Sequence, residues 1–265
     1  MTRSLPRTPN FLVIGAQKAG TTYLCAGLAQ HPRVFFSNPK ELMFFNRKAD
    51  LGGDDFKQYL DDHFASADRE RWVGEGSTTY FQSPLALPRI RTFLGQDLRI
   101  ILCIRHPVEK AVSFYLHNWR MGRLAGQEPL FDPGPGLNTS PIETSLYAPH
   151  LRRWLEAYGR ERLHVIDFNL LKTSRPAFLR AATDALEISP LAKTIERVVN
   201  PGPSIRREGE QLVVTTPPQD GQISPRFALD DLAKLQAVFD EDIRQTEDLL
   251  NMDLTHWKTS PTFLP

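Results

Sequence analysis

The chain has 265 residues, of which 41% are hydrophobic and 24% are charged, the composition of an ordinary globular protein that can bury one large core. Its 32 basic and 31 acidic residues leave a formal net charge of +1. A chain so nearly neutral has no overall field that would attract nucleic acid or an anionic membrane, and we expect no nucleic-acid partner. Any anion that it binds must meet charges that are placed locally.

The two cysteines, Cys25 and Cys103, both lie in apolar runs and are too few to cross-link a chain of this size. No stretch approaches the roughly 20 consecutive apolar residues that span a bilayer. We therefore expect a cytoplasmic protein without a transmembrane segment. Residues 1–265 are predicted to form a single domain, with a flexible N-terminus over residues 1–9.

The first predicted elements form a strand, a loop and a helix. Residues 11–14 are a continuous apolar run closed by glycine, typical of a strand buried on both faces, and residues 21–30 follow with helical spacing. A similar unit begins with the apolar run 98–104 and continues with a helix whose first residue is Pro107, where a missing N–H costs nothing.

A third apolar run, residues 163–168, lies between helical patterns over residues 151–158 and 176–186. This alternation predicts the α/β fold class, with a central parallel sheet flanked by helices and a P-loop-like nucleotide-binding core. Apolar residues at helical spacing predict a long amphipathic helix over residues 229–250.

Two stretches, 126–141 and 200–224, are rich in proline, glycine and polar residues. Both are predicted to be long loops, which in a compact domain are usually functional or mobile.

The loop between the first strand and its helix reads Gly-Ala-Gln-Lys-Ala-Gly-Thr-Thr over residues 15–22. Small residues allow backbone N–H groups to approach an anion, and the start of a helix adds positive potential. Lys18 and the hydroxyls of Thr21 and Thr22 supply further donors. The loop therefore predicts a phosphate or sulfate site, whereas the plainer interpretation is a tight turn with a solvated lysine.

An ATP-binding P-loop has its lysine directly after the second glycine. Here threonine follows Gly20, and Lys18 precedes it by two residues. Magnesium-dependent phosphoryl transfer also needs an acidic residue at a strand end, whereas the strand 98–104 is followed by Arg105. Both differences disfavour a kinase or an ATPase.

A second candidate anion site combines Arg105 with Ser113, in the second turn of the next helix. Ligands of open α/β sheets collect at the carboxyl ends of the strands, so residues 15–22 and Arg105 should face one crevice. An arginine beside a hydroxyl is a good phosphate clamp. Taken alone, Arg105 could pair with a carboxylate and Ser113 could pack in its helix. Together the two motifs indicate one ligand with two anionic ends.

These motifs resemble the sulfotransferase family that uses 3'-phosphoadenosine 5'-phosphosulfate (PAPS), especially the branch of heparan sulfate sulfotransferases and their bacterial relatives. Residues 15–22 are similar to the family's 5'-phosphosulfate loop, and residues 105–115 to its 3'-phosphate motif. Lys40-Glu41 with Phe44-Phe45 is similar to the K-E-x-x-F-F segment of that branch, and residues 75–81 to its E-K-[ST]-P-x-Y-F segment.

The resemblance implies an enzyme that transfers the sulfuryl group of PAPS to a hydroxyl or amine and releases adenosine 3',5'-bisphosphate. The acceptor is a small molecule or a glycan: a carbohydrate, a lipid or a natural product. Glu41 would act as the base, and Lys18 would stabilise the leaving group. The residues implied in nucleotide binding are Lys18, Ala19, Gly20, Thr21, Thr22, Arg105, Ser113, Arg206 and Arg207.

The chain departs from the family pattern at two places. Gly76 stands where the branch often has a second lysine, so one cationic contact is missing. Residues 205–209, which contain Arg206 and Arg207, are a loose match to the basic loop that closes over the nucleotide in the family.

Two other functions stay open, a P-loop-like nucleotide-dependent kinase and a non-catalytic nucleotide-binding protein. Glu75 could orient the acceptor or pair with Lys18. His106 is expected to cap or pack, and Tyr115 and Trp119 fall on helical stripes that favour the core over adenine stacking. The histidines show no metal-ligand spacing, so no metal site is expected.

Overall fold

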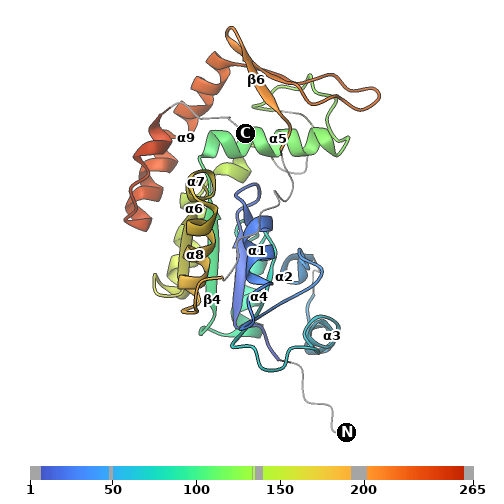
Figure 1. Ribbon diagram of the computed structural model, residues 1–265, viewed down its shortest axis with the longest axis vertical. Helices are drawn as coiled ribbons and strands as arrows, with labels where there is room; N and C mark the ends of the chain where they lie inside the picture. Colours follow the sequence, from blue (N-terminus) through green and yellow to red (C-terminus); the bar gives the residue numbers. More distant parts are fainter. Residues whose placement is uncertain (1–6, 48–49, 133, 135–139, 192–201, 260–265) are drawn as a thin grey trace. The chain divides into compact units, whose positions relative to one another are not determined.

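The computed structural model of the chain describes residues 7–47, 50–132, 134, 140–191 and 202–259. The chain divides into two compact units (Figure 1). The sheet unit comprises Met1–Ile104 and Arg153–Val199, and the helical unit comprises Arg105–Arg152 and Asn200–Pro265. The single domain expected over residues 1–265 stays a prediction.

The sheet unit is built on a five-stranded parallel sheet in the order β2-β3-β1-β4-β5. Its strands are β1 (Phe11–Gly15), β2 (Val34–Phe36), β3 (Trp72–Gly76), β4 (Arg99–Ile104) and β5 (Leu163–Asp167). Every residue of β1 and β3 is buried, as is every residue of β4 after the first. Coverage on both faces explains why β1, and β4 after its first residue, are continuous apolar runs. The predicted α/β fold, a central parallel sheet flanked by helices, is confirmed.

Strand β1 lies at the centre of the sheet, with Val13 opposite Gly76 of β3 on one side and Ile101 of β4 on the other. The chain runs from β1 to β2 on the first side and later crosses to β4 on the second. Ligands of open α/β sheets bind where the strand order reverses, at the carboxyl ends of the strands. The loop after β1 therefore lies where an anion site is expected.

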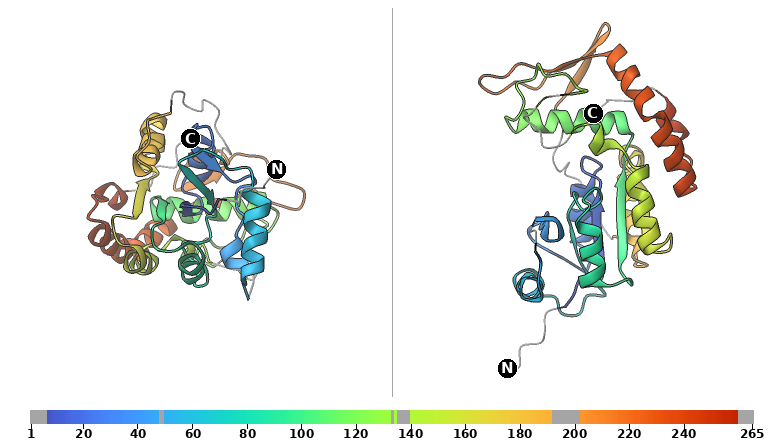
Figure 2. Two further views of the ribbon diagram at one scale, coloured as in Figure 1. Left: turned by 90° about the horizontal axis from the view of Figure 1, so that it is seen from below. Right: turned by 180° about the vertical axis from the view of Figure 1, so that it is seen from behind.

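The helices of the sheet unit are α1 (Thr21–Leu28), α2 (Phe44–Arg47), α3 (Gly53–His63), α4 (Ala86–Leu94), α7 (Asn169–Thr173) and α8 (Arg175–Ala185), and α6 (Ala148–Tyr158) crosses the boundary between the units. Figure 2 shows them from two further sides. Helix α1 packs on α8. At Gly27 of α1 a β-carbon would lie 2.4 Å from Leu179 Cδ2, so the missing side chain lets the two helices approach closely.

The helical unit contains α5 (Pro107–Arg120), which packs on α9 (Leu229–Leu250), and the short 3-10 helices η1 (Glu143–Ser145) and η2 (Thr255–Lys258). Helix α9 has the bounds that its periodicity predicts. Tyr115 and Trp119 of α5 are each 1% exposed and belong to the core, as expected. Within the described residues, no helix combines the length and apolar character needed to cross a membrane.

The prediction of one long loop over residues 200–224 is wrong for its described part. Strands β6 (Ile205–Glu208) and β7 (Gln211–Val214) lie within it and form an antiparallel sheet with β8 (Arg226–Ala228). Gly209 makes the tight connection between β6 and β7 with a left-handed φ of 57°. A four-residue strand rich in arginine offers too few apolar positions for its alternation to be recognised.

Three predictions fall partly outside the described residues. Residues 126–132 form no helix or strand, as expected of a loop, but residues 133 and 135–139 lie outside the described part of the chain. So do residues 1–6 of the N-terminus predicted to be flexible, and residues 200–201 of the second predicted loop.

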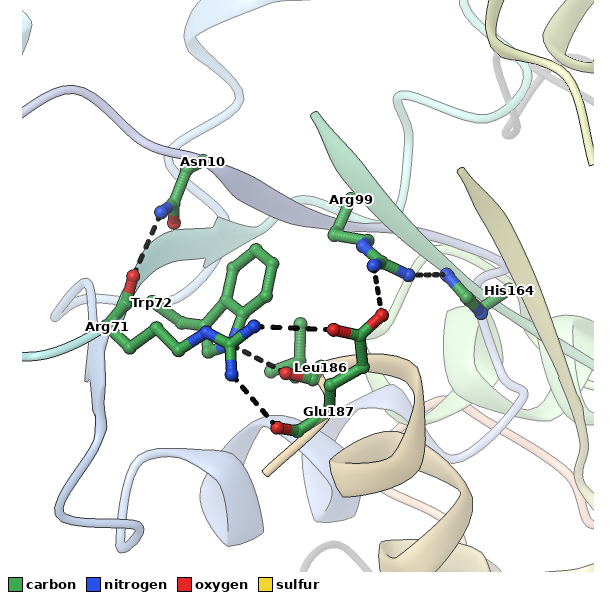
Figure 3. A network of polar contacts seen from close by, with 7 residues as sticks. All are labelled: Asn10, Arg71, Trp72, Arg99, His164, Leu186 and Glu187. Atoms are coloured by element: carbon green, nitrogen blue, oxygen red, sulfur yellow. Dashed lines mark hydrogen bonds and ion pairs between the residues drawn. The ribbon is translucent and has the colours of Figure 1, made fainter. Parts of the chain in front are cut away.

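A network of ion pairs joins the amino-terminal ends of the strands to the end of α8 (Figure 3). Glu187 accepts hydrogen bonds from Arg71, at 3.3 Å, and from Arg99. Arg99 also donates to Nε2 of His164 at 3.0 Å. The guanidinium carbons of Arg71 and Arg99 lie 5.4 and 6.0 Å from the ring centroid of Trp72. The network lies at the opposite ends of the strands from the glycine loop.

We predict that His164 makes folding stability fall in acid. Arg99 can donate to Nε2 only while that nitrogen carries no proton, and burial together with the charge of Arg99 lowers the pKa of His164 from its usual 6.5. Because the unfolded chain takes up this proton first, stability is lost as the pH falls through 6.5. In urea titrations at about pH 7.5 and about pH 5.5, the unfolding free energy should drop more in the wild type than in His164→Gln. An equal drop would contradict the prediction.

Candidate active site

The glycine loop between β1 and α1 has the backbone of an anion-binding turn. Lys18 and Gly20 have left-handed backbones, with φ of 63° and 83°, and Ala19 between them is fully buried. Turns that visit this region form concave sites lined by N–H groups. At Gly20 a β-carbon would lie 2.9 Å from the ring of Phe168, so the conformation and the space both require glycine.

The start of α1 is suited to an anion. In the part of the chain that the structure describes, its first turn has neither a side-chain cap nor an acidic residue, so no carboxylate there offsets the positive end of the helix dipole. Thr21 is buried, whereas Lys18 and Thr22 are half-buried. The residues predicted from the loop thus lie together in one turn whose chemistry fits the phosphosulfate end of PAPS.

Glu41, the predicted base, lies in a turn between β2 and α2, with a left-handed φ of 65°. Its N–H donates to the carbonyl of Gly76 at 2.9 Å. The carboxylate accepts from the N–H of Thr78 at 2.9 Å and from Oγ1 of Thr78 at 3.0 and 3.1 Å, and Lys40 donates to Oε1. The side chain is 32% exposed. The protein therefore fixes this carboxylate while leaving it within reach of solvent.

Thr78 connects Glu41 to the glycine loop. Its carbonyl oxygen lies 2.9 Å from the point where a β-carbon of Gly15 would stand, so a side chain at Gly15 would push Thr78 away. The neighbouring Ser77 donates its N–H to the carbonyl of Val13 at 3.0 Å. The structure thus brings Glu41 and the loop that carries Lys18 to the carboxyl ends of β1 and β3.

Glu75 is sealed inside the protein. Its side chain is 0% exposed, Tyr59 and Tyr80 donate to Oε1 at 2.9 and 2.8 Å, and Ser77 donates to Oε2 at 2.7 Å. Burial raises the pKa of this carboxyl, and the three hydrogen bonds oppose the rise. This burial disfavours the prediction that Glu75 orients the acceptor, because an acceptor cannot reach its carboxyl in this position, and the alternative pairing with Lys18 stays a prediction.

Gly76 has no room for the lysine that the related branch often carries. A β-carbon there would lie 2.8 Å from Cys25 Sγ, 3.1 Å from Cζ of Phe36 and 3.6 Å from Cε of Lys40. Cys25 is 3% exposed and packed in the core, so it cannot simply turn aside. The departure from the family pattern therefore has a packing cause.

Arg105 is the first residue of the helical unit and follows β4 directly. Its Nε donates to Glu109, one helical turn later, at 3.1 Å. Its N–H donates to the hydroxyl of Tyr147 at 2.9 Å, and that hydroxyl donates back to its carbonyl at 2.9 Å. Since a guanidinium has five N–H donors, the pair with Glu109 is compatible with an additional phosphate contact.

Two further residues of α5 follow Arg105. Ser113 is half-buried. Lys110 is fully buried and donates to the carbonyl of Thr144. Burial and the charge of Arg105 lower the pKa of Lys110 to about 7, against the opposing charge of Asp242. The candidate 3'-phosphate motif thus also contains a fully buried lysine.

Arg206 and Arg207 lie on β6, with side chains 68% and 64% exposed. Arg206 pairs with Glu208, and Arg207 donates to the carbonyl of Gly209 at 3.0 Å. These contacts lie within their own hairpin. Their part in nucleotide binding stays a prediction.

His106 is buried and packs, as expected. It precedes α5, its ring centroid lies 6.3 Å from that of Trp257, and Nε2 lies 3.3 Å from the carbonyl oxygen of Thr259. Over the described ranges of the chain, no group of three or more histidine, cysteine or acidic residues could hold a metal ion.

The contact of Thr78 with Glu41 and the burial of Lys110 could not be predicted from the sequence. Thr78 lies in the segment 75–81 that resembles the family, so its position was visible but its contact with Glu41 depends on tertiary structure. Nothing in the sequence indicates that Lys110 is buried, because a single lysine on a helix is usually solvated.

We predict that Gly76→Lys destabilises the protein instead of restoring a contact. The new side chain must displace Cys25 or Phe36, which should lower the free energy of unfolding by about 1–3 kcal/mol. Urea titration measures the change. Gly53→Lys is the control, because a β-carbon there meets nothing within 4 Å, and we expect its effect to stay within about 0.5 kcal/mol. Equal stability of the two variants would show that position 76 can accept a lysine.

Comparison with known proteins identifies relatives. The human bifunctional heparan sulfate N-deacetylase/N-sulfotransferase 2 is 30% identical over 210 residues, which cover 71% of this chain and 23% of the relative. The membrane-associated sulfotransferase kil1 of Dictyostelium discoideum is 34% identical over 107 residues, which cover 40% of this chain and 22% of the relative. The match therefore spans less than a quarter of the length of these relatives.

A solved structure is also similar. The crystal structure of a sulfotransferase from Alicyclobacillus acidocaldarius matches with a TM-score of 0.67 and 25% identity, over 96% of this chain and 100% of that one. The sequence profile of the sulfotransferase domain family matches residues 8–200. The chain therefore belongs to the sulfotransferase domain family, a family of transferase enzymes, as its motifs imply.

Proposed function

We propose that this chain transfers the sulfuryl group of PAPS to a hydroxyl or amine of its acceptor. The observation that carries the proposal is the meeting of an anion-binding glycine loop and a fixed carboxylate, Glu41, at the carboxyl ends of β1 and β3. PAPS, when bound, supplies an activated sulfuryl group on its 5'-phosphate. A site that holds this group beside a base meets the requirement of an in-line displacement.

Glu41 takes the acceptor proton while the acceptor oxygen or nitrogen forms its bond to sulfur and the bond from sulfur to the bridging oxygen breaks. Lys18 and the N–H groups of residues 19–22 stabilise the electron pair that stays on the bridging oxygen. The products are the sulfated acceptor and adenosine 3',5'-bisphosphate. Thr78 and Lys40 orient the carboxylate for this role, since both donate hydrogen bonds to it.

Arg105 and Ser113 would bind the 3'-phosphate that distinguishes PAPS from simpler nucleotides. Two observations support this proposal. Glu109 and Tyr147 orient Arg105, and Ser113, on the helix that follows Arg105, is half-buried. Arg206 and Arg207, exposed on β6, would add contacts to the nucleotide.

The acceptor is proposed to be a glycan or a small molecule. The names of the similar heparan sulfate N-sulfotransferases support an amine on a glucosamine-containing polysaccharide as the first acceptor to test. A hydroxyl acceptor is the second. A cytoplasmic location is likewise part of the proposal.

Nucleotide binding gives the first test. Lys18→Ala and Arg105→Ala should each weaken binding of adenosine 3',5'-bisphosphate by about tenfold to a hundredfold in isothermal titration, because each removes charge-assisted hydrogen bonds. Lys57→Ala and Arg244→Ala, which remove exposed surface cations, are the controls and should bind like the wild type. Unchanged affinity in both site variants would refute the site, and magnesium-dependent turnover of ATP would favour a kinase.

Turnover gives the second test. Glu41→Gln should lower kcat by about a hundredfold or more, the usual contribution of a general base, with nucleotide affinity nearly unchanged. The assay is release of adenosine 3',5'-bisphosphate from PAPS with N-deacetylated heparosan, against N-acetylated heparosan as the hydroxyl-only acceptor. Glu210→Gln, at an 89% exposed side chain, is the control. Wild-type kcat in Glu41→Gln would place the base elsewhere, and absence of turnover with every acceptor would favour a non-catalytic binding protein.

A further inference from the structure

The burial of the Glu75 carboxylate calls for a structural or functional explanation. Placing a carboxylate where its side chain is 0% exposed costs free energy unless hydrogen bonds compensate. Three hydroxyls do so, from Tyr59, Ser77 and Tyr80, at 2.7 to 2.9 Å. A hydrophobic side chain would fill the same space at lower cost. The network is therefore more elaborate than packing of β3 requires.

Two of these hydroxyls also hold the segment that follows Glu41. Ser77 Oγ accepts the N–H of Met43 at 2.9 Å, and the hydroxyl of Tyr80 accepts the N–H of Phe45 at 3.4 Å. Each hydroxyl has a single proton, which it gives to Glu75, and this leaves its lone pairs directed at the backbone N–H groups. The carboxylate thus sets the direction in which both hydroxyls accept.

The segment held in this way is strained. Glu41 and Met43 both have left-handed backbones, with φ of 65° and 53°, which side chains other than glycine rarely adopt. Such conformations cost free energy and persist only where surrounding contacts impose them. Hydrogen bonds to Met43 and Phe45, together with the bond from Glu41 N–H to Gly76, supply those contacts on both sides of the turn.

We propose that Glu75 is a positioning residue, which through Ser77 and Tyr80 fixes the turn from Glu41 to Phe45 and so holds the Glu41 carboxylate beside the glycine loop. This inference rests on the proposed function of Glu41. It assigns to Glu75 no contact with the acceptor or with PAPS.

Tyr59 provides a matched control. Its hydroxyl donates to the same oxygen of Glu75 as that of Tyr80, but it comes from α3. Its contacts with the segment are made by the ring, which stacks on Phe44 at 4.3 Å and meets Phe45 edge-on at 5.7 Å. A phenylalanine keeps that stack. Tyr59→Phe and Tyr80→Phe therefore remove one equivalent donor to Glu75 each, whereas Tyr80→Phe also removes the acceptor for Phe45.

The test compares Tyr59→Phe, Tyr80→Phe and Glu75→Gln in the full chain by hydrogen–deuterium exchange of the peptide that contains residues 41–46. We expect exchange of the Met43 and Phe45 amides to accelerate at least tenfold in Glu75→Gln, that of Phe45 in Tyr80→Phe, and both to stay within twofold of the wild type in Tyr59→Phe. Equal exchange in the two tyrosine variants, or unchanged exchange in Glu75→Gln, would overturn the inference.

Turnover of PAPS with N-deacetylated heparosan separates this inference from the proposed function. Tyr80→Phe and Glu75→Gln should lose at least tenfold in kcat while KM for PAPS stays within about twofold, and Tyr59→Phe should retain the wild-type kcat. If Glu41→Gln is inactive but Glu75→Gln turns over like the wild type, positioning by Glu75 is refuted and the base is not. If Glu41→Gln itself is fully active, the proposed function of Glu41 fails first.

Discussion

The candidate active site depends on the close approach of Thr78 to the end of β1. Gly15 has no side chain, so the carbonyl of Thr78 can lie 2.9 Å from where its β-carbon would be. From that position Thr78 uses its N–H and its hydroxyl to bind the carboxylate of Glu41. The segment that follows β3 therefore joins the turn of the candidate base to the end of β1, since Ser77 and Phe81 also donate their N–H groups to the carbonyls of Val13 and Ile14.

Much of this architecture could be predicted from the sequence, because long apolar runs and helical periodicity report burial directly. Strands β1, β4 and β5 and helix α9 were recognisable in this way. The hairpin of β6 and β7 was not, because each strand has only four residues and β6 contains two exposed arginines. Local patterns thus predicted the long apolar runs and missed short or interrupted strands such as β3, in which Glu75 and two glycines break the apolar run although every residue is buried.

The candidate site also combines residues that could be predicted from the sequence with contacts that could not. Lys18 and Arg105 could be proposed from sequence, because a glycine loop and a strand-end arginine have recognisable spacing. The contact of Thr78 with Glu41 and the sealing of Glu75 could not, because they join residues from different strands and turns. The resemblance to the family singles out Glu41 as the candidate base, but the burial of Glu75 is seen only in its exposure and its hydrogen-bond partners.

The contact between Cys25 and Gly76 has a consequence for how related chains can differ. The thiol of Cys25 and any side chain at position 76 would occupy the same volume, since the sulfur lies 2.8 Å from the missing β-carbon. A side chain at position 76 therefore requires Cys25 or Phe36 to move, because a β-carbon there would lie 2.8 Å from Cys25 Sγ and 3.1 Å from Cζ of Phe36. The effect of a substitution at position 76 should thus depend on which residues occupy positions 25 and 36.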